Sequence, residues 1–172
     1  SVDGVATDGD GNIFITSVTG AYTGDYAQVE GIGMGYLDTA VIKYSSSGEK
    51  LWAKAVSGSG RESLGSVVAD GKGGCVVAGH YELITTTVPD GTLDGVHNCG
   101  ETDAVAIRFN SDGSIRWIRS IGGISGDVIT DIAATEYGYA VVGYTSSSNR
   151  DFASMGNRGA TDSFVALIPP EG

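Results

Sequence analysis

The chain has 172 residues, of which 41% are hydrophobic, and a formal net charge of −11, so we expect one domain with a substantial core. The acidic balance makes nucleic acid an unsuitable partner, because binding a polyanion needs clustered Lys and Arg. We also expect no membrane insertion, since no apolar run approaches the roughly 18 to 20 residues that span a bilayer.

The sequence predicts an all-β fold built from hairpins. Its 28 glycines separate short β-branched runs, as in the turns Asp8-Gly-Asp-Gly-Asn12 and Asn110-Ser-Asp-Gly113. The predicted strands are residues 2–7, 13–17, 39–44 and 50–56, then 64–69, 75–79, 104–109 and 115–121, then 129–135, 139–143 and 163–168. Pro169 and Pro170 end the last strand, because proline cannot donate to a sheet ladder.

A repeat organises these strands into three units. Asp38-Thr-Ala-Val-Ile-Lys-Tyr44 returns 65 residues later as Asp103-Ala-Val-Ala-Ile-Arg-Phe109, and after another 59 residues as Asp162-Ser-Phe-Val-Ala-Leu-Ile168. A unit that cannot bury its own apolar face must stack on its neighbours. We therefore predict a single repeat domain, residues 1–172, of antiparallel four-stranded units at about 1–61, 62–126 and 127–172, the last one incomplete.

Four strands per repeat of this length are typical of a β-propeller blade. The sequence resembles the SBBP-type propeller repeats of bacterial surface and secreted proteins. The residues that carry the resemblance are Asp8-Gly-Asp-Gly-Asn-Ile-Phe-Ile15, Gly74-Cys-Val-Val-Ala-Gly79, Asp103-Ala-Val-Ala-Ile-Arg-Phe-Asn-Ser-Asp-Gly-Ser-Ile-Arg-Trp117, Gly122-Gly-Ile-Ser-Gly-Asp127, Gly24-Asp-Tyr26 and Asp151-Phe152. They cover nearly the whole chain.

The resemblance implies a propeller-like array that is a fragment of a larger propeller or a ring completed by another copy, because propellers usually close with about four to eight blades. The expected partners are further blades, from the parent chain or another copy, and a protein or glycan ligand. The expected role is a non-catalytic binding or structural module of a secreted or cell-surface bacterial protein, hence extracellular. The alternative is part of a glycan-active propeller enzyme whose active site is completed by other blades or chains; a cluster of carboxylates with raised pKa values would favour it.

Function is expected in the three long loops, residues 18–37, 80–102 and 144–161, because loops on a rigid scaffold commonly carry binding. They differ in length and content while the strands around them repeat. The candidate binding residues are Tyr22, Tyr36, Tyr81 and His97. Tyr26 and Phe152 are also aromatic, but we expect them to anchor their loops onto the sheets.

The sequence offers a weak calcium alternative at Asp8, Asp10 and Asn12, whose side-chain oxygens alternate. An EF-hand loop would continue with Gly at its sixth position and Glu at its twelfth, where this chain has Ile13 and Thr19. We therefore favour a hairpin turn and expect no cofactor.

Cys75, Cys99, His80, His97 and Glu82 could be read as a zinc site, but their spacing matches no zinc-finger pattern. We expect Cys75 to be a small core residue, and a Cys75–Cys99 disulfide is a further possibility.

The remaining position-matched residues are expected to be structural. Asp38, Asp103 and Asp162 open equivalent strands, where a carboxylate can cap backbone amides. Trp52 and Trp117 are expected to fill the space between adjacent sheets. Lys43 and Arg108 are expected to pair with the acidic surface.

Overall fold

The computed structural model confirms an all-β protein of three antiparallel sheets. The structure describes residues 1–20, 26, 28–29, 32, 36–82, 92–93, 96, 98 and 100–172. The described residues include a three-residue 3-10 turn, η2 (Arg150–Phe152), and no α-helix. In the same part of the chain, no helix has the length and hydropathy needed to cross a membrane.

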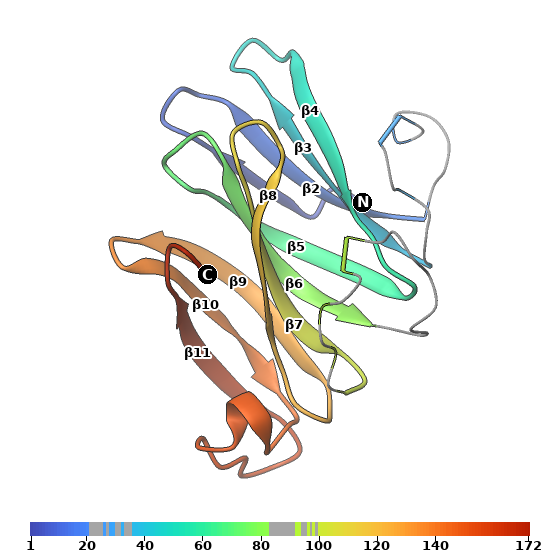
Figure 1. Ribbon diagram of the computed structural model, residues 1–172, viewed down its shortest axis with the longest axis vertical. Coiled ribbons are helices and arrows are strands. Elements are labelled where there is room, and N and C mark those ends of the chain that lie inside the picture. Colours follow the sequence, from blue (N-terminus) through green and yellow to red (C-terminus); the bar gives the residue numbers. More distant parts are fainter. Residues whose placement is uncertain are drawn as a thin grey trace.

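Each sheet is a meander in which the strands follow chain order (Figure 1). We call the sheets blades 1, 2 and 3. Blade 1 contains β1 (Gly4–Thr7), β2 (Ile13–Thr19), β3 (Asp38–Tyr44) and β4 (Lys50–Val56). Blade 2 contains β5 (Arg61–Ala69), β6 (Cys75–Glu82), β7 (Asp103–Phe109) and β8 (Ile115–Ile121). Blade 3 contains β9 (Asp127–Thr135), β10 (Gly138–Thr145) and β11 (Asp162–Ile168). All eleven predicted strands are confirmed, with ends that shift by a few residues.

The blades stack face to face, so that blade 2 lies between the other two (Figure 1). One buried cluster joins blades 1 and 2 and includes Phe14, Val41, Val77 and Ile107. The apolar surface that each sheet cannot bury alone is therefore covered by the next sheet, as the repeat predicts.

A second buried cluster joins blades 2 and 3 and includes Ala78, Ala106, Val141 and Phe164. The first strands of the blades, β1, β5 and β9, also lie beside one another in sequence order. This is the arrangement of neighbouring propeller blades around a common axis.

A glycine in the second strand allows the first strand to approach closely in blades 2 and 3. A Cβ on Gly79 would lie 2.0 Å from the Ser63 carbonyl oxygen, and one on Gly143 would lie 1.9 Å from that of Val128. Both glycines lie beside register shifts, where a bulge bends the strand pair. Blade 1 has Ser17 at this position and a regular β1–β2 register.

Candidate functional site

The two ends of the blades differ in chemistry. At the end with the tight turns, the aspartates accept hydrogen bonds that fold the turns. In blade 1, Oδ1 of Asp8 accepts hydrogen bonds from the amides of Asp10 (3.0 Å) and Asn12 (2.9 Å), and Oδ2 accepts one from Nδ2 of Asn12 (2.9 Å). Burial alone would raise the pKa of Asp8, but these hydrogen bonds outweigh it and lower the pKa. The three residues of the calcium alternative thus fold a turn, and both Asp8 oxygens take part in it.

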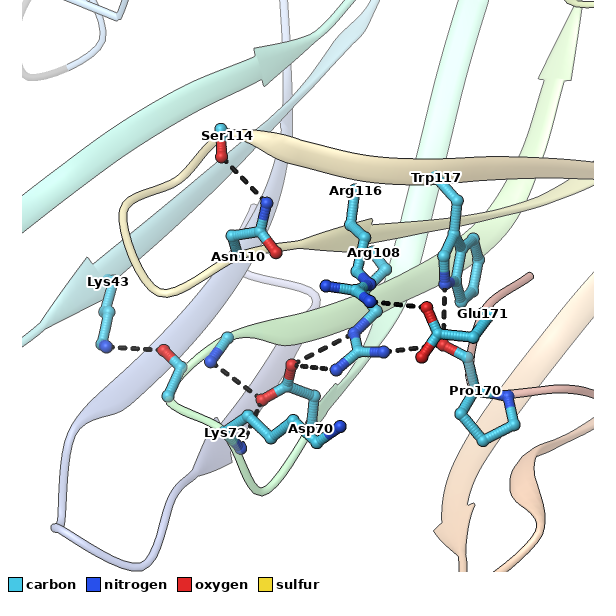
Figure 2. Close-up of polar contacts among 12 residues, drawn as sticks. Lys43, Asp70, Lys72, Arg108, Asn110, Ser114, Arg116, Trp117, Pro170 and Glu171 are labelled. Atoms are coloured by element: carbon cyan, nitrogen blue, oxygen red, sulfur yellow. Dashed lines mark hydrogen bonds and ion pairs between the residues drawn. The ribbon is translucent and has the colours of Figure 1, made fainter.

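The equivalent turn of blade 2 adds a buried ion pair (Figure 2). Oδ1 of Asp70 accepts hydrogen bonds from the amides of Lys72 and Gly74, while Oδ2 accepts two from Arg108, at 3.1 and 2.7 Å. Burial would raise the pKa of Asp70, but the bonds from Arg108 and the two amides lower it. Both side chains of the pair are only 3% exposed, so this turn is fixed by a covered charge pair.

Lys43 and Arg108 also connect each blade to the next. Nζ of Lys43 in blade 1 donates to the Gly73 carbonyl of blade 2 at 2.7 Å, and Nη1 of Arg108 in blade 2 donates to the Pro170 carbonyl of blade 3 at 2.6 Å. Both side chains are buried. The expectation that both cations pair with the acidic surface is wrong for Lys43, whose hydrogen bond goes to a backbone carbonyl. Arg108 does pair with an acid, but that acid is the buried Asp70.

Trp52 and Trp117 make the same connection with their indoles. Nε1 of Trp52 donates to the Ser111 carbonyl of blade 2 at 3.0 Å. Figure 2 shows the matching contact, in which Nε1 of Trp117 donates to the Pro170 carbonyl of blade 3 at 3.1 Å. Trp52 lies between Phe14 and Phe109, with ring centroids 6.2 and 6.0 Å away. The prediction that these tryptophans pack between sheets is confirmed.

The opposite end of the blades holds a buried pair of acids, Asp38 and Glu62, at the junction of blades 1 and 2. The backbone sets their positions: the Glu62 amide donates to the Leu37 carbonyl at 2.8 Å, and Oγ1 of Thr39 donates to the Glu62 carbonyl at 2.7 Å. Both acids are fully buried.

Burial, and then the charge of Asp38, raise the pKa of Glu62 to about 8. Neither Glu62 oxygen has a hydrogen-bond partner of good geometry among the described residues. The amides of Gly58 and Gly60 are close enough to offset a small part of the shift. Burial and the neighbouring Asp38 therefore favour the protonated, neutral form of Glu62.

The junction of blades 2 and 3 repeats this position with better hydrogen bonding. Asp127 replaces Glu62, and its amide donates to the Thr102 carbonyl at 2.8 Å. Its carboxylate accepts hydrogen bonds from Thr145 Oγ1, Ser147 Oγ and the Gly123 amide, at 2.5, 2.9 and 2.8 Å. The same junction position thus has an acid with three hydrogen-bond donors between blades 2 and 3, and an acid of raised pKa between blades 1 and 2.

The three aspartates that open equivalent strands are placed differently. Asp38 and Asp103 are fully buried, whereas Asp162 is half-buried and accepts a hydrogen bond from the Arg158 amide at 2.7 Å. The predicted backbone capping is confirmed for Asp162.

Each long loop contributes a buried apolar side chain to the stack. These residues are Val29, Leu93 and Phe152. Phe152 packs on Phe164 with ring centroids 5.2 Å apart, which confirms its predicted anchoring role. The hydroxyl of Tyr26 lies 2.7 Å from Oγ of Ser17 and ties the first loop to β2. Sequence reasoning missed Val29 and Leu93 because neither belongs to a periodic pattern.

The candidate binding residues do not form one group. Tyr36 is 71% exposed and stands free for contact. Tyr81 is 0% exposed, and its hydroxyl lies 3.1 Å from Oγ of Ser120, so the expectation of an exposed ring is wrong. It was misplaced because β6 runs on to Glu82, beyond its predicted end, and carries Tyr81 into the core. Tyr22 and His97 lie outside the described residues.

The structure contradicts the zinc and disulfide alternatives that use Cys75. Cys75 is a free, buried cysteine, and burial raises the pKa of its thiol. It stands five residues from His80 on one strand, which separates them by about 17 Å, too far to share a metal. Burial lowers the pKa of His80. Across the described residues, no three His, Cys, Asp or Glu side chains gather as metal ligands would. Cys99 lies outside those residues.

Two hollows open on the parts of the array that no other blade covers. One, of about 450 Å³, lies on the outer face of blade 1 between the sheet and the first loop, and its walls include Ile15, Ile42 and Val29. The other, of about 260 Å³, lies in the third loop beside Phe152 and Arg158.

Comparison with known proteins shows a distant similarity. No protein-family model matches the chain. The chain is similar over its whole length to the regulatory protein FlaEY of Caulobacter vibrioides, with 24% identity over 175 residues. It spans 18% of the length of that protein. The similarity is therefore to a small part of a much longer bacterial protein.

Proposed function

We propose that the chain is a non-catalytic interaction module of a secreted or cell-surface bacterial protein, in which blades of one type dock face to face. The similarity to part of a long bacterial regulatory protein supports a modular role. SBBP-type repeats, whose pattern the sequence resembles, are the kind of blade we propose. The loops at one end of the stack, with Tyr36 exposed, would present the module to a protein or glycan ligand.

One observation carries the proposal: the same cross-strand pair is covered at both internal junctions and exposed at the end of the stack. Thr16 pairs with Val41 in blade 1, and Ala78 pairs with Ala106 in blade 2. All four are fully buried by the following blade. The equivalent pair in blade 3 is larger and more apolar.

That pair is Val142 and Val165, which are 41% and 71% exposed. The surface that a blade covers elsewhere is therefore presented uncovered on blade 3, and exposed apolar surface of this kind marks an interaction site.

The outer face of blade 1 offers the complementary surface. Its register aligns Val5, Ile15 and Ile42. The equivalents of Ile15 and Ile42 in blade 2, Val77 and Ile107, receive blade 1 in the first core cluster. A further blade of the same type could therefore dock on the outer face of blade 1, and another on the outer face of blade 3.

A turn glycine supports the same docking. Trp52 packs within 3.0 Å of where a Cβ on Gly113 would lie, and Trp117 within 2.8 Å of the same point on Gly172. The equivalent Gly48 of blade 1 has open space around it, where the tryptophan of a preceding blade would fit.

The acidic pair supports a non-catalytic role over the glycan-active alternative. Asp38 and Glu62 do include a carboxyl of raised pKa, the feature that would favour an enzyme. Both are fully buried between two sheets, where a substrate could not reach them. A general acid must come within hydrogen-bonding distance of its substrate.

The docking can be tested with a second copy as the available blade. Light scattering should give a mass that rises with concentration from 17.5 kDa to twice that value, as two copies close a six-bladed ring. The net charge of −11 opposes association, so the dimer should strengthen with salt above about 0.15 M. A mass of 17.5 kDa at every concentration and salt would refute docking between copies.

Single variants show which faces meet. Val5→Asp on blade 1 and Val165→Asp on blade 3 should each prevent the dimer, because the contact joins unlike faces and a buried unpaired charge is costly. Tyr137→Asp, an exposed turn residue at the far end, is the matched control and should still dimerise. If only one of the two face variants acted, the contact would join like faces and the proposed arrangement would be wrong.

A further inference from the structure

A hollow of about 220 Å³ opens between the tight turns of blades 2 and 3, at the end of the stack away from the long loops. Its walls include Asp70 and Arg108 of blade 2 and Tyr139 of blade 3. Lys72 and Glu136 also line it, and both are exposed, so they stand at its rim. The hollow lies at an internal junction, so its two sides come from neighbouring blades and not from the outer faces of the stack.

The Tyr139 hydroxyl lines this hollow and has no hydrogen-bond partner in the part of the chain that the structure describes. The Tyr139 side chain is only 4% exposed, and its ring packs against Trp117 and the Arg108 guanidinium. The hydroxyl itself is not completely covered, so it reaches the hollow. Burial raises the pKa of Tyr139, so the hydroxyl keeps its proton and can both donate and accept a hydrogen bond. A buried phenol normally has a partner, which a bound molecule would supply here.

The charges around the hollow are balanced. Asp70 and Arg108 form its covered part, where Oδ2 of Asp70 lies 2.7 Å from Nη2 of Arg108 and each neutralises the other (Figure 2). Lys72 and Glu136 add one charge of each sign at the rim, where solvent screens both. The covered part therefore has no net charge to attract an ion, which favours a neutral ligand.

Hydrogen bonds within each turn hold both sides of the hollow in place. On blade 2, Oδ1 of Asp70 accepts a hydrogen bond from the Lys72 amide at 2.7 Å. On blade 3, Oγ1 of Thr135 donates to the Gly138 carbonyl at 3.1 Å and accepts from the Tyr137 amide at 3.2 Å. A ligand would therefore meet a preformed site and would lose little affinity to the ordering of the turns.

We propose that this hollow binds one pyranose ring of a neutral sugar, either a free monosaccharide or the end of a glycan. Sugar hydroxyls both donate and accept hydrogen bonds, so they suit the Tyr139 hydroxyl, Nζ of Lys72 and the Glu136 carboxylate. Pro170 adds apolar surface for the C–H groups of the ring. The volume is below the roughly 300 to 1,000 Å³ of pockets for drug-sized ligands, which limits the occupant to a small molecule. This site shares the glycan ligand class of the proposed function, but it lies at the opposite end of the stack and does not depend on the docking of blade faces.

The test is an NMR titration of the full chain with the methyl α-glycosides of glucose, mannose and galactose. At least one glycoside should bind saturably, with a dissociation constant of about 1 to 10 mM, and should shift the amides of residues 70–74 and 134–139. Maltotriose then separates the two sources: binding as tight as that of the glucoside supports a glycan end, and weaker binding supports a free sugar.

Conservative variants test the groups that would hold the sugar. Tyr139→Phe removes only the hydroxyl and keeps the ring that packs against Trp117, so it should weaken binding about fivefold. Tyr137→Phe, at an exposed tyrosine outside the hollow, is the matched control and should leave binding unchanged. Glu136→Gln should weaken binding about tenfold, because hydrogen bonds to a charged group are the stronger ones.

Three results would overturn the sugar site. They are equal binding by Tyr139→Phe and the native chain, amide shifts that centre outside the two turns, and no saturation by any glycoside up to about 50 mM. Sodium acetate, inorganic phosphate and glycine serve as charged probes, and tighter binding of any of them than of the glycosides would also overturn the proposal, because the site would then select charge. Blade docking is read from the molecular mass instead, so either proposal can fail without the other.

Discussion

The buried Glu62 makes the stability of the blade stack depend on pH. Its pKa is about 8 in the folded chain, against an ordinary value of 4.5. Between these values the folded chain binds more protons than the unfolded chain, so the free energy of unfolding falls as pH rises. The stability that depends on protonated Glu62 is complete below about pH 4.5 and is lost by the time pH has risen through about 8.

The magnitude follows from the same shift. Each unit of pKa corresponds to 1.36 kcal/mol, so the difference between 4.5 and about 8 corresponds to about 5 kcal/mol. This is a large part of the roughly 5 to 15 kcal/mol that stabilises a typical domain. Glu62→Gln keeps the size and the neutral form and removes the titration. We expect the variant to match the native chain near pH 5 and to exceed it by several kcal/mol at pH 9.

Urea unfolding at a series of pH values measures this difference directly. Glu136→Gln is the control, because it removes the same charge from an exposed turn. Its free energy of unfolding should follow that of the native chain at every pH. A difference between Glu62→Gln and the native chain that stays constant from pH 5 to 9 would refute the buried-acid reasoning.

Three further predictions test the buried ion pair, the burial of Cys75 and the close approach of β5 to Gly79. Arg108→Met should cost about 3 to 5 kcal/mol in urea unfolding, because it leaves Asp70 buried without its partner, whereas Arg116→Met, which removes an exposed pair, should leave the unfolding midpoint nearly unchanged. Cys75 should resist alkylation in the folded chain and react once urea unfolds it, as read by mass spectrometry of the labelled peptide; rapid native labelling would contradict its burial. Gly79→Ala should cost about 3 kcal/mol because its Cβ would meet a backbone carbonyl, while Gly126→Ala, with open space around it, should change little.

The strands could be predicted because their signals are local. Gly-rich turns such as Asp8-Gly-Asp-Gly-Asn12 mark hairpins directly, and the repeat of Asp38 as Asp103 fixes which strands are equivalent. The end of β11 also followed from the sequence, since Pro169 cannot donate to a sheet ladder. The turn residues and the repeat were thus enough to predict the strands and their grouping into three sheets.

The buried polar contacts could not be predicted, because they join residues of different blades. Nothing in the sequence indicates that Lys43 reaches a turn 30 residues ahead, or that Glu62 meets Asp38 across a junction. Tyr81 was expected in a loop because the strand was predicted to end at residue 79, whereas β6 continues to Glu82. The stacking of sheets, rather than any local pattern, decides whether such side chains face water or the core.

One set of contacts joins each blade to the next. Nuclear Overhauser effects between aromatic rings test these contacts most directly, because the rings involved belong to different sheets. We expect effects between Trp52 and Phe109 and between Trp117 and Tyr139, whose ring centroids are both 6.0 Å apart. Tryptophans that show effects only within their own sheets would contradict the stacking of the three blades.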